Sequence, residues 1–349
     1  MARNTGKYAT LLFIIVFTVM VCLTSCSLKK NTASTRNYTA FITKYNIYYN
    51  GDTHYKETLS EMEKNYEDDY TALVLTHPAQ AKTNEKAPQP SGDFTRSIEK
   101  AQKAIQLRSI KKKPKKKSGK KNNPEYKEWM KRDEYNPFLH NAWMMMGRSQ
   151  FMNGDFLGSA STFFYISKHF TWLPETVTES KLWQARSYCT MDWLYECEVI
   201  ITRIKAEELT SKNLKFLYNV TYADFLIRSE KYAEAVPFLR EAIENTNGAQ
   251  KTRLNFLLGQ ILSRTGEKAE AYKAYAAAGK WGGASYRTKF NARIKQSEVY
   301  EGTDISKEVS ALKRMTKYAR NKEYLDQIYY AIGILYISRN DTTEAVKYY

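Results

Sequence analysis

The sequence predicts an all-α, right-handed superhelical solenoid built from repeated pairs of antiparallel helices. A small residue in the first helix of each pair is followed, twelve positions later, by a small residue in the second helix. The pairs are Gly147 with Ser159, Ala185 with Cys197, Ala223 with Ala235, Gly259 with Ala271, and Gly333 with Ala345. Two antiparallel helices approach closely only where small side chains face each other, so this spacing predicts one helix hairpin per repeat.

A bulky residue completes each unit, four positions after the second small residue. These bulky residues are Phe163, Ile201, Leu239, Tyr275 and Tyr349. The small residues of the first four units lie 38, 38 and 36 positions apart, close to the roughly 34-residue period of tetratricopeptide repeats. The pattern resembles that family, and the resemblance implies a concave surface lined by the first helices.

The chain begins with a pattern typical of a bacterial lipoprotein signal over residues 1–25. Arg3 and Lys7 precede an apolar run from Leu11 to Leu23, which is shorter than the roughly 20 residues that span a bilayer as a helix. Leu23-Thr24-Ser25-Cys26 resembles a lipobox, in which the cysteine thiol receives a diacylglycerol and becomes the first residue. We therefore expect lipidation at Cys26 and a tether over 26–37. An ordinary cleaved signal or a short membrane anchor is the alternative.

The residues after Cys26 indicate a location. Two or more acyl chains hold a protein stably on a membrane. Lys29 and Lys30 make the start of the tether basic, whereas surface-exported lipoproteins of Bacteroidetes carry an acidic stretch there. We therefore expect the periplasmic face of the outer membrane. This oxidising compartment permits a disulfide between Cys189 and Cys197, although small packing residues are the favoured interpretation.

An irregular helical block, residues 38–107, is expected before the repeats. The expected elements are helices over 38–50 and 55–66 joined at Gly51 and Asp52, an extended stretch over 70–75, a Pro-rich linker over 77–92, and an amphipathic helix over 94–107. The first two helices resemble a divergent first repeat.

A lysine-rich linker, residues 108–124, follows the block and is expected to be disordered. It holds eight lysines within residues 111–121 and contributes to the formal net charge of +17. A secretory signal excludes nucleic acid as a partner. Attraction to anionic lipid head groups or to an acidic partner remains open, as does a solvated linker without any partner.

The expected solenoid covers residues 125–349. The pattern is irregular around Ala292, and the next helix is expected from Ile305 to Ala319. The last unit stops halfway through its second helix. Because solenoids normally close with a polar capping helix, we expect this sequence to be a fragment of a longer protein.

No pattern in the sequence indicates catalysis, a metal or a cofactor. The four histidines, His54, His77, His140 and His169, are scattered without metal-ligand spacing. The glycines from Gly279 to Gly283 fit an inter-repeat turn better than a phosphate loop, and the run Glu67-Asp68-Asp69 is expected in polar, flexible surroundings. We expect the protein not to be an enzyme.

The candidate binding surface is the concave face, at the position after each small residue and four positions further on. These columns contain Arg148, Arg186, Asp224, Gln260 and Arg293, then Met152, Thr190, Arg228 and Arg264. The arginines at 148, 186, 228 and 264 are the candidate partner-binding residues, because guanidinium groups bind carboxylates through paired hydrogen bonds. A solvated face without a partner is the alternative.

Two tyrosine-rich segments, together with the lipobox and the lysine-rich interruption, extend the resemblance. The segments are Lys44-Tyr45-Asn46-Ile47-Tyr48-Tyr49-Asn50-Gly51 and Asn321-Lys322-Glu323-Tyr324-Leu325-Asp326-Gln327-Ile328-Tyr329-Tyr330. They resemble the PorW/SprE family of tetratricopeptide lipoproteins, which serve type IX secretion and gliding motility in Bacteroidetes.

The resemblance implies an outer-membrane adaptor that binds protein components of a secretion apparatus. It carries over no catalytic residues. Two alternatives remain: a barrel-assembly lipoprotein that binds unfolded outer-membrane proteins, and a SusD-like glycan-binding lipoprotein. The second needs large insertions with exposed aromatic residues, which this repeat region lacks.

Overall fold

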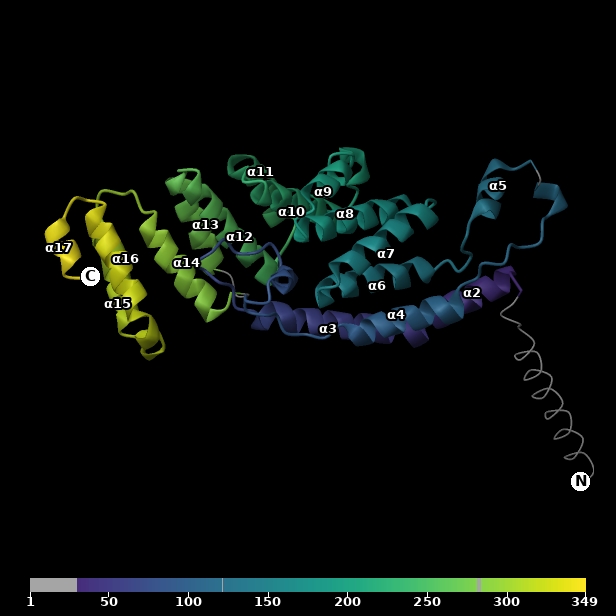
Figure 1. The fold of residues 1–349 in the computed structure, drawn as a ribbon, viewed down its shortest axis with the longest axis horizontal. Helices are drawn as coiled ribbons and strands as arrows, with labels where there is room; N and C mark the ends of the chain where they lie inside the picture. Colours follow the sequence, from purple (N-terminus) through teal and green to yellow (C-terminus); the bar gives the residue numbers. More distant parts are fainter. Residues whose placement is uncertain (1–29, 121, 281–283) are drawn as a thin grey trace, which may run out of the picture.

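The computed structural model describes residues 30–120, 122–280 and 284–349, and these residues form an elongated all-α solenoid without β-strands (Figure 1). Within them, no helix is long and apolar enough to cross a membrane. The expected signal and its lipid site at Cys26 lie outside the described residues, as does most of the expected turn from Gly279 to Gly283.

Paired helices make up the repeat region. The pairs are α6 (Leu139–Asn153) with α7 (Phe156–His169), α8 (Pro174–Thr190) with α9 (Leu194–Ile201), α10 (Lys212–Arg228) with α11 (Tyr232–Glu244), α12 (Gly248–Arg264) with α13 (Lys268–Lys280), α14 (Tyr286–Glu298) with α15 (Ser306–Thr316), and α16 (Leu325–Ile337) with α17 (Thr342–Val346). Short 3-10 helices, η4 (Ala206–Glu208) and η5 (Ala319–Tyr324), lie between pairs.

The helices of a pair approach where the sequence places small residues. A Cβ on Gly147 would lie 2.7 Å from the ring of Phe163, and the hydroxyl of Ser159 donates a 2.9 Å hydrogen bond to the Gly147 carbonyl. A Cβ on Gly259 would likewise lie 2.7 Å from the ring of Tyr275. The twelve-residue spacing is therefore confirmed, and in the units that begin with Gly147, Gly259 and Gly333 the bulky residue packs over the glycine of the first helix.

The helices α14 and α15 depart from the register expected around Ala292: they meet through side chains, without the close backbone approach of the other pairs, and both pack on α16. Ser297 is fully buried and precedes the buried Val309 by twelve positions, so Ser297 holds the place of the small residue. Arg293 forms a 2.6 Å ion pair with Glu308 of α15. The placement of Arg293 in the concave column is therefore wrong, and Glu298 occupies that position. The register could not be recognised from the sequence because serine and valine replace the usual glycine and alanine.

The N-terminal block contains one continuous rod where two helices joined at a turn were expected. The helix α2 (Ala33–Ile42) continues through a π-helical segment, η1 (Thr43–Tyr48), into α3 (Tyr49–Asn65). Its start at Ala33 also lies inside the expected tether. Gly51 is buried within α3, where a Cβ would lie 2.7 Å from Met145 and 3.0 Å from Lys100. The glycine serves close packing here, and the prediction of a break was wrong.

The expected amphipathic helix is confirmed as α4 (Thr95–Arg108), which lies beside α3 and packs on α6 (Figure 1). Ala101 and Ala104 are fully buried at this contact. The ring of Phe94, also fully buried, lies 5.6 Å from that of Tyr55. The partner of α3 is thus α4, which comes some 30 residues later in the chain.

Of the two segments expected to be linkers, one is partly buried in the structure and the other is exposed. Within 77–92, the 3-10 helix η2 (Pro78–Thr83) is buried at Ala79, Gln80 and Ala81, so the prediction of a linker is wrong there. In the lysine-rich stretch the side chains of residues 111–113 and 115–120 are exposed, with a single 3-10 turn, η3 (Ser118–Lys120). The helix α5 (Pro124–Lys131) follows and precedes the first paired helix, α6.

Replacing Ala235 with Trp should destabilise the solenoid. Ala235 is fully buried in the contact between α10 and α11, and overpacking such a site costs about 1–3 kcal/mol or more. Thermal unfolding followed by circular dichroism measures the effect. Ala233→Trp, at an exposed position of the same helix, is the matched control. Equal melting temperatures for the two variants would contradict the helix register.

Candidate protein-binding groove

The concave face of the solenoid is occupied by the chain's own residues 66–83, here called the strap. The strap leaves the end of α3, crosses the inner faces of α14, α12, α10 and α8, and ends with η2. Its residues 76–81 are deeply buried, with exposed fractions of 2% at Thr76 and 1% at Gln80, whereas Glu67, Asp69 and Thr71 near its start are exposed. The groove expected to be open is therefore filled along its middle.

Side-chain amides of α12 hold the strap by its backbone. Gln260 accepts a hydrogen bond from the backbone N–H of Val74 (2.9 Å) and donates one to the carbonyl of Ala72 (2.7 Å). Gln250 donates a third, to the carbonyl of Thr76 (2.6 Å). Buried backbone groups must find partners, and these glutamines take the place that a neighbouring β-strand would fill.

The beginning of the strap is fixed by a buried ion pair and an aromatic contact. Asp68 lies 2.8 Å from Arg253, and both side chains are at least nine-tenths buried. The hydroxyl of Tyr70 lies 2.8 Å from that of Thr288, and its ring packs against Phe256. The expectation of polar, flexible surroundings for the acidic run is therefore wrong at Asp68.

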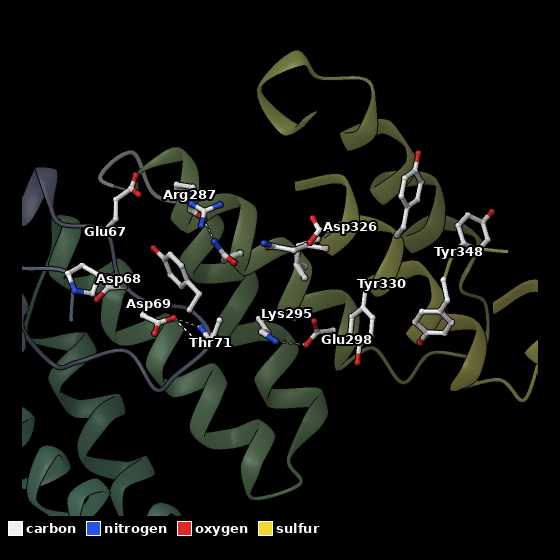
Figure 2. A pocket seen from close by; sticks show the side chains of 17 residues that line it. Glu67, Asp68, Asp69, Thr71, Arg287, Lys295, Glu298, Asp326, Tyr330 and Tyr348 are labelled. Atoms are coloured by element: carbon white, nitrogen blue, oxygen red, sulfur yellow. Dashed lines mark hydrogen bonds and ion pairs between the residues drawn. The ribbon is translucent and has the colours of Figure 1, made fainter. Parts of the chain in front are cut away.

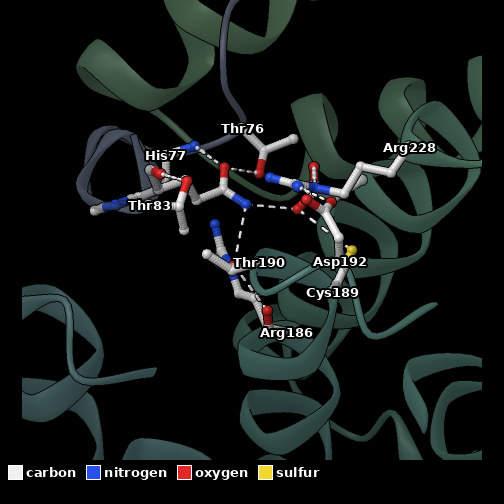
Figure 3. A network of polar contacts seen from close by, with 10 residues as sticks. Thr76, His77, Thr83, Arg186, Cys189, Thr190, Asp192 and Arg228 are labelled. Atoms are coloured by element: carbon white, nitrogen blue, oxygen red, sulfur yellow. Dashed lines mark hydrogen bonds and ion pairs between the residues drawn. The ribbon is translucent and has the colours of Figure 1, made fainter. Parts of the chain in front are cut away.

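The other end of the strap inserts Gln80 into a polar network between α8 and α10 (Figure 3). Its amide nitrogen donates to the carboxylate of Asp224 (2.5 Å) and to Thr190 (3.3 Å). Its amide oxygen accepts from the hydroxyl of Thr76 and from the backbone N–H of His77. All five residues are buried, so the network fixes both the strap and the inner face of the repeats.

Arg228 closes the same network on the solvent side. Its guanidinium donates to Asp224 at 3.3 Å and to Asp192 at 2.5 Å. The carboxylate of Asp224 raises the pKa of Arg228 well above its usual value. The guanidinium of Arg228 thus already binds two carboxylates of its own chain.

The other candidate arginines lie in three different environments. Arg186 is 3% exposed and lies against the rings of Phe151 and Trp183; burial lowers its pKa despite the nearby Asp224 carboxylate. Arg148 lies over the ring of Tyr55, 5.8 Å from its centroid. Arg264 is exposed, beside Tyr232. The structure therefore lacks the expected continuous basic face, and partner binding by the four arginines stays a prediction.

Beyond the strap the groove is open (Figure 2). A cavity of about 990 Å³ lies between the start of the strap and the helices α14, α16 and α17. Carboxylates and tyrosines dominate its lining, which includes Glu67, Asp68, Asp69, Glu298, Asp326, Tyr329, Tyr330, Tyr348 and Tyr349. These five carboxylates outnumber the two cations of the lining, Arg287 and Lys295. Tyr330 and Tyr349 are each more than half exposed. This open end of the groove is acidic and aromatic, opposite in charge to the face that the sequence suggested.

Sequence reasoning missed this site. Asp326, Tyr329 and Tyr330 were noted only as part of a resemblance. Their positions seven, four and three before Gly333 place them on the inner face of α16, and that spacing could have identified them.

Cys189 and Cys197 are free and fully buried in the packing between α8, α9 and α10. This agrees with the favoured interpretation of small packing residues. A hydrogen bond with Cys197, together with burial, raises the pKa of the Cys189 thiol. Among the described residues, no group of three or more His, Cys, Asp or Glu side chains could hold a metal ion.

Comparison with known proteins supports the fold. A family model described as "Tetratricopeptide repeat" matches residues 326–349, which contain all but the first residue of α16 and the whole of α17. No curated protein matches the chain. The fold is an all-α tetratricopeptide-repeat solenoid, and repeats of this kind are protein-interaction scaffolds.

Replacing Gln260 with Leu should loosen the strap. Leucine is close to glutamine in size but cannot form hydrogen bonds, so the backbone groups of Ala72 and Val74 lose their partners. This loss should lower the stability of the docked strap by about 1–3 kcal/mol. Faster hydrogen exchange over residues 70–80 is the measurement. Gln102→Leu, on the exposed face of α4, is the control, and unchanged protection of the strap in Gln260→Leu would contradict the proposed clamp.

Acidification should release the strap through His77. Burial lowers the pKa of His77 from 6.5 to about 4, and it faces Glu63 of α3, Arg186 of α8 and Arg253 of α12. Between pH 4 and pH 6.5, His77 therefore binds more protons when the strap is undocked than when it is docked. Docking is fully favourable above about pH 6.5 and weakens as the pH falls towards 4.

Proteolysis within residues 66–92 as a function of pH measures this release. The His77 ring nitrogen accepts the N–H of Ala79 at 3.1 Å, and an asparagine can accept the same bond without titrating. His77→Asn should therefore resist acid better than the parent protein. Identical pH profiles would exclude His77 as the titrating group.

Proposed function

We propose that this chain is a lipid-anchored adaptor of a protein secretion apparatus, related to the PorW/SprE proteins of type IX secretion and gliding motility. It acts by binding proteins, on the periplasmic face of the outer membrane. The lipobox and the two tyrosine-rich segments support this assignment. Tethering at a membrane raises the effective concentration of a solenoid near membrane-bound partners.

The observation that carries the proposal is the division of the groove into a filled part and an open part. In the filled part, side chains of α12 bind an extended segment by its backbone. In the open part, Asn291 and Gln327 line the cavity, each six positions before the small residue of its helix, as Arg253 is in α12. Because Arg253 binds the strap at Asp68, the open part offers amide groups at a position that contacts the strap in the filled part.

The charges of the open end favour a basic partner segment. Glu67 and Asp326 form no ion pair within the described residues, whereas Glu298 is paired with Lys295 at 2.8 Å. The exposed ring of Tyr330 adds a surface for cation–π contact. An extended segment that carries Lys or Arg therefore fits this end of the groove best.

Charge reversal at Asp326 should impair secretion. Asp326→Lys should reduce export of cargo that carries the type IX C-terminal signal while outer-membrane barrels assemble normally, because it repels a basic segment. Glu234→Lys is the matched control, since Glu234 also lies in the first turn of a helix and is exposed on α11.

Quantifying secreted cargo and assembled barrels in the same cells separates the possible functions. Barrel defects that precede loss of export would favour the barrel-assembly function. Loss of growth on a polysaccharide alone would favour glycan capture. Wild-type export by Asp326→Lys would exclude the open end of the groove as the docking site.

A further inference from the structure

The lysine-rich stretch is attached to its neighbours at defined points. The side-chain amide of Asn31 donates to the carbonyl of Lys112 at 2.7 Å. The hydroxyl of Tyr126, on α5, accepts from the backbone N–H of Lys117 at 3.1 Å and contacts the carbonyl of Lys115 at 3.5 Å. The start of α2, the lysine-rich stretch and α5 therefore form one surface, which a free linker would not do.

These three segments enclose a cavity of about 720 Å³ with a strong charge imbalance. Its charged lining residues are Arg36, Lys115, Lys117, Lys120, Arg132 and Glu125. None of these five cations forms an ion pair with any residue that the structure describes. Five cations held around one hollow favour an anionic partner.

Two aromatic rings, those of Tyr126 and Trp129, line the same cavity. Trp129 is stacked on Tyr126 at 5.7 Å, and Arg36 lies over the Trp129 ring at 5.0 Å from its centroid. Arg132 lies 4.6 Å from the ring centroid of Trp172. Amphipathic aromatic rings beside cationic side chains are typical of the boundary between a membrane and water.

The position of the cavity in the chain selects a membrane as its partner. Asn31 and Thr32 line the cavity, and Asn31 lies five positions after Cys26 in the sequence. Because an extended chain advances by at most about 3.6 Å per residue, a lipid on Cys26 would keep this surface within about 18 Å of the bilayer. This step rests on the proposed lipid anchor.

We propose that this basic, aromatic surface binds the anionic head groups of the membrane to which the protein is anchored. The lipid on Cys26 retains the protein, whereas the head-group contact orients the solenoid relative to the bilayer. The surface lies at the end of the molecule opposite α16 and α17 (Figure 1), so the acidic open end of the groove is directed away from the membrane.

Vesicle co-sedimentation tests the surface without the lipid anchor. The mature chain with Cys26→Ala should bind vesicles of phosphatidylcholine with phosphatidylglycerol, and not vesicles of phosphatidylcholine alone. The triple variant Lys115→Gln, Lys117→Gln, Lys120→Gln should bind about 100-fold more weakly, from roughly fivefold per lysine at an anionic surface. High salt should weaken parental binding.

A matched triple variant controls for net charge. Lys212→Gln, Lys215→Gln, Lys231→Gln removes the same charge from exposed positions at α10 and the start of α11, and should bind like the parent. Equal loss in both triple variants would overturn the proposal, as would equal binding to the two kinds of vesicle. Binding to soluble polyglutamate but not to anionic vesicles would assign the surface to an acidic protein and also overturn it.

Fatty-acid labelling of the wild-type chain in cells tests the anchor separately. Labelling of Cys26 without head-group binding would leave the adaptor proposal intact and remove only this inference.

Discussion

The structure depends on satisfying the polar groups that line the inner face of the repeats. Asp224, Gln250 and Gln260 point into the groove and are buried, and buried polar groups without partners are costly. The strap provides their partners through its backbone and through Gln80. It also inserts Val74 into the apolar core of α10–α13. The strap is therefore part of the solenoid's core as well as an occupant of its groove.

This arrangement explains how the N-terminal block becomes part of the repeat stack. A strap bound along α8–α14 brings the end of α3 to the middle of the groove, while α4 packs on α6. Gly51 permits the close crossing of α3 with Met145 and Lys100. The block and the repeats thus share their cores, with Tyr55 and Met62 packed in the same cluster as Phe151 and Leu182.

The two ends of the molecule differ in charge. Cations gather around Trp129 at the end nearest the N-terminus, and carboxylates with exposed tyrosines gather around α16 at the other end. The formal net charge of +17 does not reveal this separation of charge, because a sum over the sequence carries no information about position. A polar distribution of this kind suits a protein that faces a membrane at one end and a protein partner at the other.

The sequence by itself determined the helix pairs, because each pair is a local contact. Gly147 and Ser159 lie twelve residues apart, and their meeting needs only two helices and a short turn. The sequence pattern did not predict the register at Ser297, where serine and valine replace the usual small residues. It also gave the wrong interpretation of Gly51, because a glycine suits both a turn and a close packing contact. Only the tertiary structure decided the course of the strap and the identity of the open site. The bonds of Gln80 to Thr190 and of Val74 to Gln260 join residues 110 and 186 positions apart, and no local spacing encodes such contacts.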